Sequence, residues 1–384
     1  MIKAHYKMLN KELEQEYIRL IKNTLIDDCD RKFLMLYKKM NITAIQNIDE
    51  ILIADFNKLC LIADQYEQNK NKLKKQDITN LKMIFNYGYY KFTKNTKLAN
   101  AIQNFFERYV SNNTCYYCNL EYTNSFVHEI IYNDVNEFIN KANSDLLFSI
   151  PEFNHHDVNV IVKSRKSKLI TLADLSPDIQ SKINNVPIEQ ICNNYRNQFT
   201  LDHIIDKATY EITAISLYNL VPTCFTCNCK LKGSKSYIDM AKSNTYKVSP
   251  THINHSFNKE MKFNICYKNN GQTVTTNFSN VLVGSNNHKI TLQETTFTNN
   301  VYDDFIKLMK LNERYNYHIS DALDLLEKKI SYPDSTLNMI SKTTGMPINK
   351  LKSDLFGKEI FSGELHEKIM TKFKRDIAKQ IGII

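Results

Sequence analysis

Residues 199–235 read FTLDHIIDKATYEITAISLYNLVPTCFTCNCKLKGSK, and we expect the rest of the chain to be organised around them. This stretch holds an Asp-His pair, two separated asparagines, a Cys-x-x-Cys pair and a Lys-Gly-Ser-Lys tail. The pattern favours a short strand at 197–201 closed by Asp202 and His203, a second strand at 218–222, and a cysteine knuckle that runs into a helix. The sequence therefore predicts a small core rich in metal-binding and phosphate-binding groups.

Two close cysteine pairs predict a structural metal site. They are Cys115 with Cys118 in NTCYYCN, and Cys224 with Cys227 in PTCFTCN. Two thiolates spaced by two residues can hold one tetrahedral ion from a single turn, so two such pairs predict a four-cysteine zinc site. Residues 119–223, 105 in number, separate the pairs and predict an insertion at about 120–195. Cys229 is an alternative to Cys227 as the fourth ligand, although the spacing favours Cys227.

The same stretch offers groups for metal-assisted hydrolysis. Asp202 can give a hard oxygen to Mg²⁺ or Mn²⁺, Asn228 can give a second oxygen, and His203 can take a proton from water near neutral pH. Consecutive strand residues point to opposite faces, so Asp202 and His203 serve one site only if the strand bends or ends there. Taken singly these residues have simpler interpretations as a cap, a buried histidine and a turn. Three lysines are candidate phosphate-binding groups: Lys230, Lys232 and Lys235.

These residues, in this order, resemble the HNH endonuclease superfamily, in its subset that carries four zinc-binding cysteines. The resemblance covers residues 115–119 and 199–236. It implies a ββα-metal core in which His203 activates the attacking water. Asp202 and Asn228 would then hold one divalent ion that stabilises the scissile phosphate and the leaving 3′ oxygen. Asn219 would hold the loop that positions His203.

The resemblance implies a metal-dependent endonuclease that hydrolyses phosphodiester bonds of DNA. The extended pattern is similar to a bacterial subgroup that includes anti-phage defence effectors, some of them encoded beside an ATPase. Expected partners are therefore DNA and an ATPase or another defence-system protein, with a second copy of the chain as a further candidate. RNA or tRNA is the alternative substrate. The rival from another class is a catalytically silent zinc module that binds nucleic acid or protein.

Composition limits the alternatives. The chain has 384 residues, 42% of them hydrophobic and 24% charged, which is ordinary for a globular protein, and no apolar run approaches the roughly 20 residues of a membrane span. The first residues, MIKAHYKMLNKELEQEY, show no secretory signal, so we expect a cytoplasmic protein without a membrane partner. Nine cysteines are too sparse for a disulfide scaffold. The net charge of +9 is compatible with a polyanionic partner.

Periodicity predicts an α+β protein, predominantly helical around the small core, with one short β-rich segment. The predicted parts are a helical region at 1–110, the nuclease core at 111–240 with its insertion, a β-rich segment at 241–300 and a helical region at 301–384. We expect a hairpin around Asn269-Asn270-Gly271 and a further strand in KITLQETTF. In the last region, Ser320 is a candidate helix cap, and two short helices around Gly345 are reminiscent of a helix-turn-helix. An apolar stripe there is expected to be core: Leu365, Ile369, Phe373, Ile377 and Ile381.

Other conspicuous residues receive simpler interpretations. The run EQNKNKLKKQD, with lysines at 70, 72, 74 and 75, is typical of a solvated helix face or loop, and contact with nucleic acid is the minority interpretation. Adjacent His155 and His156 cannot easily share one metal ion, and His128 is not expected to be a ligand either. The isolated cysteines are expected to be buried thiols: Cys29, Cys60, Cys192 and Cys266.

Overall fold

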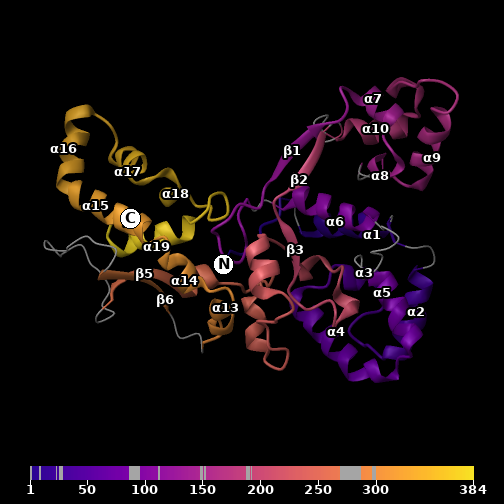
Figure 1. Ribbon diagram of the computed structural model, residues 1–384, viewed down its shortest axis with the longest axis horizontal. Helices are drawn as coiled ribbons and strands as arrows, with labels where there is room; N and C mark the ends of the chain where they lie inside the picture. Colours follow the sequence, from indigo (N-terminus) through magenta and orange to yellow (C-terminus); the bar gives the residue numbers. More distant parts are fainter. Residues whose placement is uncertain are drawn as a thin grey trace. The chain divides into compact units, whose positions relative to one another are not determined.

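The computed structural model describes residues 2–7, 10–22, 24–25, 29–85, 96–110, 113–147, 150, 153–186, 191, 193–268, 287–295 and 300–384. The chain divides into two compact units (Figure 1). Unit 1 comprises residues 1–3, 112–122 and 223–384, and unit 2 comprises residues 4–111 and 123–222. Most described residues are helical and the strands form small antiparallel sheets, so the α+β class is confirmed. No helix in the described ranges is long and apolar enough to cross a membrane.

The first part of unit 2 is a set of amphipathic helices, as the periodicity predicts. Leu13 and Tyr17 on α1, and Ile102 and Phe105 on α6, are buried. The side chain of Asp55 caps α4 by accepting a hydrogen bond from the Lys58 amide. The elements are α1 (Asn10–Lys22), α2 (Cys29–Met40), α3 (Ile48–Leu52), α4 (Phe56–Asn69), the 3₁₀ helix η1 (Lys70–Lys72), α5 (Lys75–Phe85) and α6 (Thr96–Tyr109).

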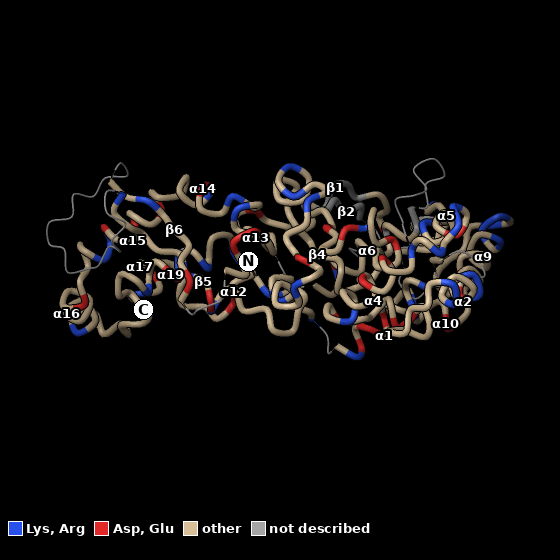
Figure 2. Tube along the Cα trace, turned by 90° about the horizontal axis from the view of Figure 1, so that it is seen from below, with Lys and Arg blue, Asp and Glu red and all other residues tan. Residues whose placement is uncertain are grey.

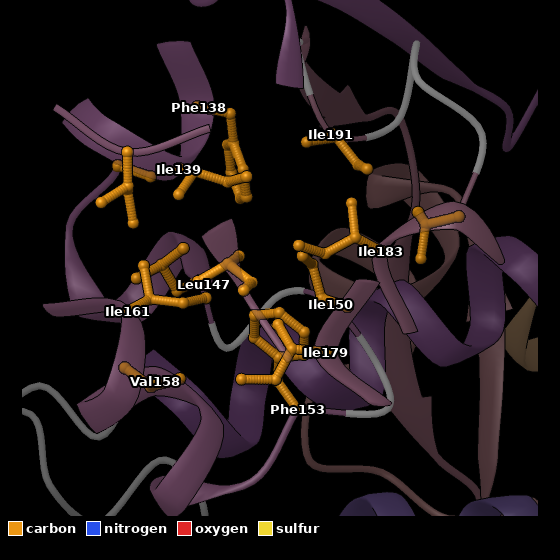
Figure 3. Close-up of a cluster of buried hydrophobic side chains, with 14 of the residues drawn as sticks. Phe138, Ile139, Leu147, Ile150, Phe153, Val158, Ile161, Ile179, Ile183 and Ile191 are labelled. Carbon is orange, nitrogen blue, oxygen red and sulfur yellow. The ribbon is translucent and has the colours of Figure 1, made fainter. Parts of the chain in front are cut away.

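A helical module follows, connected through a two-stranded ribbon. Strand β1 (Ser125–Ile130) pairs antiparallel with β2 (Asn193–Asn197), and the ribbon leads to the module helices (Figure 1). These are α7 (Val135–Lys141), α8 (Ser144–Leu147), α9 (His155–Ser164), η2 (Leu172–Asp174) and α10 (Pro177–Asn184). Figure 3 shows their shared core, in which Phe138, Leu147, Ile161 and Ile179 are buried. The module lies within the segment that the sequence predicts as an insertion.

The central stretch forms short elements in the predicted order. Strands β3 (Thr200–His203) and β4 (Leu220–Thr223) form a two-stranded sheet, with η3 (Glu211–Thr213) and η4 (Leu217–Asn219) between them. The helix after the knuckle is a π-helix, η5 (Thr226–Lys232), which ends at Gly233 with a positive φ of 53°. Single-turn π segments occur frequently at functional sites.

The rest of unit 1 is built on the antiparallel pair β5 (Met261–Tyr267) and β6 (His288–Glu294). Helix α19 packs on β5 and α14 on β6, and the rings of Phe263, Tyr315 and Phe373 pack against one another in tilted and edge-to-face pairs. The helices are η6 (Ser243–Val248), α12 (Phe257–Glu260), α13 (Asp303–Leu308), α14 (Leu311–Asn316), α15 (Ile319–Ser331), α16 (Asp334–Thr344), α17 (Ile348–Phe356), α18 (Lys358–Phe361) and α19 (Thr371–Gln380).

The structure revises two local predictions. Ser320 does not cap a helix, because α15 begins at Ile319 and its N-cap is His318. The apolar stripe is helical only from Thr371, because Met370 adopts a left-handed φ of 57° that ends any continuous helix there. Its members Phe373, Ile377 and Ile381 are buried as core. Helices α16 and α17 flank Gly345 as predicted. Strand β6 is the KITLQETTF strand, whereas the turn at 269–271 lies outside the described residues.

Candidate functional site

The four predicted cysteines meet in one buried cluster. The sulfurs of Cys115, Cys118, Cys224 and Cys227 all lie within 4.8 Å of one another. A tetrahedral tetrathiolate zinc site, with Zn–S distances of about 2.3 Å, has sulfurs about 3.8 Å apart, and the Cys118 and Cys224 sulfurs are 3.9 Å apart. The donor set therefore fits a structural zinc ion. Cys229 is exposed and lies outside the cluster.

Backbone geometry explains why this sequence forms a sulfur cage. Asn119 takes a left-handed φ of 55°, which closes the first knuckle, and its amide donates to the Cys115 carbonyl oxygen at 2.9 Å. The Leu120 amide then donates to the Cys118 sulfur at 3.4 Å. The Cys224 amide donates to the Cys115 sulfur at 3.3 Å, which ties the second knuckle to the first. Such amide donors stabilise thiolates.

A cation that the sequence does not mark also contacts the cluster. Arg314 on α14 donates from Nη1 to the Cys227 sulfur at 3.2 Å and from Nη2 to Glu121 Oε1 at 3.3 Å. Burial lowers the Arg314 pKa, but the Cys118 and Cys227 sulfurs outweigh burial and raise it, so the guanidinium stays charged. Burial raises the pKa of the Cys115 thiol. Arg314 stands 87 positions after Cys227, and no motif surrounds it that would identify it from sequence.

In unit 2, Asn219 fastens the segment that follows His203. Its Oδ1 accepts from the Ile205 amide at 2.7 Å, and its Nδ2 donates to the carbonyl oxygens of Ile205 at 3.1 Å and Thr213 at 3.0 Å. The Asn219 carbonyl oxygen also accepts from the Ile204 amide at 3.0 Å. Strand β3 ends at His203, which meets the requirement that the strand end at the Asp-His pair. Asp202 and His203 are both buried.

The remaining candidate residues belong to unit 1. The Asn228 amide donates to the Cys224 carbonyl oxygen at 3.1 Å, and its own carbonyl oxygen accepts from Gly233 at 2.7 Å, so Asn228 is held in the π-helix beside the cluster. Lys230 and Lys235 are exposed, whereas Lys232 is buried with 4% exposure. In the described ranges no further set of three His, Cys, Asp or Glu side chains comes within ligating distance. Mg²⁺ needs fewer protein ligands, because it keeps several waters.

The structure also describes most of the histidines and isolated cysteines that were not expected to bind metal. His155 and His156 are exposed at the start of α9. Cys29, Cys60 and Cys266 are buried, as predicted, and burial raises the pKa of Cys29 to about 11. The side chains of His128 and Cys192 lie outside the described part of the chain.

Comparison of the chain with protein-family models, curated proteins and solved structures gives no match. Any functional assignment therefore depends on the residues themselves. The two local arrangements that carry it are the four-cysteine cluster of unit 1 and the Asn219-fastened loop after His203 in unit 2.

Proposed function

We propose that the chain is a metal-dependent HNH endonuclease that hydrolyses phosphodiester bonds of DNA. The observation that carries the proposal is the set of hydrogen bonds that the buried Asn219 side chain makes with Ile205 and Thr213: its Oδ1 accepts from the Ile205 amide, and its Nδ2 donates to both carbonyl oxygens. An asparagine that fixes the loop after the Asp-His pair is what the HNH resemblance implies. The order of strand β3, strand β4, cysteine knuckle and helix η5 supports the same ββα core.

In this proposal each group has a distinct role. His203 takes a proton from the attacking water as a general base. Asp202 and Asn228 hold Mg²⁺ or Mn²⁺, which when bound supplies charge stabilisation at the phosphate. Asn219 acts through His203 as a positioning residue. The exposed Lys230 and Lys235 contact phosphate oxygens, whereas Lys232, also predicted to do so, is buried and has no such role. The four thiolates hold a structural zinc ion, which fixes the start of the helix that carries Asn228.

The direct test is nicking of supercoiled plasmid with added Mg²⁺ or Mn²⁺. We expect the wild-type chain to nick, His203→Ala to lose at least 100-fold in rate on the scale of general-base catalysis (about 10²–10⁴-fold), and His155→Ala, an exposed histidine of α9, to match wild type. Equal nicking by wild type and His203→Ala would indicate a contaminant. The absence of nicking by both proteins would favour the silent zinc module. Parallel incubation with tRNA tests the alternative substrate, because cleavage of tRNA without nicking of plasmid would indicate an RNA-cleaving nuclease.

We propose further that the enzyme acts in bacterial anti-phage defence under the control of an ATPase partner. The support is the extended pattern around the Asp-His pair and the second knuckle. Plaque counts on bacteria that express the chain with its neighbouring genes test this role. Protection should require His203, and protection that survives His203→Ala would contradict it.

A further inference from the structure

Six lysines gather on three packed elements of unit 2. Helix α2 packs against both η1 and α5. We call this set the lysine cluster; it consists of Lys38 and Lys39 on α2, Lys70 and Lys72 in η1, and Lys74 and Lys75 at the start of α5. All are exposed except Lys70, which is half-buried. Figure 2 shows Lys- and Arg-bearing segments beside the labels of α2 and α5.

The charge of this cluster is mostly uncompensated. Asp77 is buried, pairs with Lys39 at 2.7 Å and accepts from the Lys74 amide at 3.0 Å. The hydrogen bond from Lys39 lowers the pKa of Asp77, so this acid stays ionised and cancels one charge. Lys70 has a weaker pair with exposed Glu67 at 3.9 Å. No carboxylate in the described ranges pairs with the other four members, Lys38, Lys72, Lys74 and Lys75.

The lysine cluster is connected to the loop that follows the Asp-His pair. Lys70 Nζ donates to the Thr209 carbonyl oxygen at 2.9 Å. Helices α4 and α5 both pack on η3, where Tyr66 donates to Glu211 at 2.7 Å. The last residue of η3, Thr213, accepts from Asn219 Nδ2 at 3.0 Å. These contacts lie within unit 2, so the lysine cluster has a fixed position beside the loop that follows His203 and is held by Asn219.

We propose that the lysine cluster binds the phosphate backbone of the duplex DNA on which the chain acts, an inference that rests on the proposed nuclease function. Unpaired, exposed lysines release condensed counterions from DNA when they meet phosphates, and each contact contributes about 0.9 to the slope of log affinity against log salt. Phosphate contacts carry no base information. The cluster therefore gives affinity and register without sequence preference.

The test compares binding of a fluorescently labelled 30-base-pair duplex between 50 and 200 mM salt, without added Mg²⁺ or Mn²⁺ so that strands stay intact. The variant is Lys72→Gln/Lys74→Gln/Lys75→Gln. The control, Lys163→Gln/Lys166→Gln/Lys342→Gln, removes the same charge from exposed lysines elsewhere. We expect the variant to lower the salt slope by about 2.7 and affinity by roughly tenfold or more at 150 mM salt. The control should change both by much less. Circular dichroism confirms that both variants remain folded.

Each outcome is decisive. Wild-type slope and affinity in the variant, or equal losses in variant and control, would overturn the lysine cluster as a DNA site. Loss of binding to phosphatidylserine vesicles with DNA binding unchanged would assign the cluster to a membrane instead. DNA binding that depends on the cluster, together with absence of nicking in the plasmid assay, would contradict the nuclease proposal. The lysine cluster would then still be supported as a DNA-binding site. A wild-type chain that binds no duplex at 50 mM salt would overturn both.

Discussion

At the scale of single residues, the Asn219 side chain holds the loop that follows His203. It bonds to the backbone of Ile205 at the start of this loop and to the backbone of Thr213 farther along it. Asn219→Ala leaves the buried Ile205 amide without its acceptor, and such a loss costs about 1–3 kcal/mol. We expect the free energy of unfolding to fall by that amount and plasmid nicking to fall at least tenfold. Denaturant titration and the nicking assay measure the two effects. Normal nicking by a destabilised Asn219→Ala chain would show that the residue has no positioning role.

Arg314 offers a second residue-scale prediction, because it places a permanent positive charge beside Cys227. Removal of groups that contact metal ligands typically weakens metal affinity about 10–100-fold. We expect Arg314→Met to weaken zinc binding within that range, with a smaller loss for Arg314→Lys. Competition with a chromophoric chelator measures the affinity. Arg375→Met, which removes a half-buried arginine bonded to the Gly363 carbonyl oxygen, is the matched control. Unchanged affinity in Arg314→Met would contradict the prediction.

His255 gives unit 1 a dependence on pH. Burial lowers its pKa to about 3, although the Lys247 carbonyl oxygen contacts its Nδ1 at 3.0 Å. The unfolded chain binds a proton near pH 6.5 and the folded chain does not, so the stability present above that pH is lost as the pH falls toward 3. Between pH 6.5 and 4 the loss is about 3 kcal/mol. Denaturant titration should show that this loss is absent in His255→Gln. The difference between the two proteins isolates His255, and parallel pH profiles would contradict the assignment.

At the scale of elements, the helical module carries its own buried core, formed by α7 to α10. Substitutions in such a core cost about 3–5 kcal/mol for Phe→Ala. We therefore expect Phe138→Ala to remove amide protection in 131–191 while protection in the β5–β6 pair is retained. Hydrogen exchange with mass spectrometry resolves the two regions. Equal loss of protection in both would show that the module does not fold independently.

The elements also show what local sequence can predict. Helical periodicity correctly predicted the helices described within 1–110 and 301–384, because amphipathic spacing is a property of the segment itself. The cap of α15 was predicted wrongly, since the N-cap is His318 and not Ser320. The helix of the apolar stripe begins only at Thr371, because the left-handed Met370 is held by a long-range contact. The Met370 amide donates to the Asn119 carbonyl oxygen at 2.6 Å from far along the chain. The contact of Arg314 with Cys227 is equally long-range, and no local pattern encodes it.

At the scale of the whole molecule, unit 1 joins three distant segments around the four-cysteine cluster. Tyr315 donates to the Cys118 carbonyl oxygen at 2.6 Å. At the start of α19, the Met370 amide donates to the Asn119 carbonyl oxygen and the Lys372 amide to Asn119 Oδ1. The spacing of the two knuckles was sufficient to predict the cluster, since a metal site requires all four thiols together. The Asp202 and Asn228 ion site remains a prediction.

Metal removal tests this organisation. We expect purified protein to hold about one zinc per chain through mild chelation and to lose Mg²⁺ or Mn²⁺ on dialysis, because a structural zinc site couples binding to folding. A strong chelator should then lower the melting temperature of unit 1 and expose its thiols. Elemental analysis, thiol titration and calorimetry provide the readouts. Zinc-free protein with unchanged melting would contradict the structural role of the cluster.

The separation of the two knuckles also sets an order of events during translation. Cys118 precedes Cys224 by 106 positions, which is about 5–20 s of ribosomal synthesis at about 5–20 residues per second. The helical module between them is synthesised completely within that interval and can fold early. The thiols of Cys115 and Cys118 are by then present, but those of Cys224 and Cys227 are not. Unit 1 is therefore the late-maturing half of the nascent chain, and its assembly depends on zinc supply at the moment when Cys227 leaves the exit tunnel.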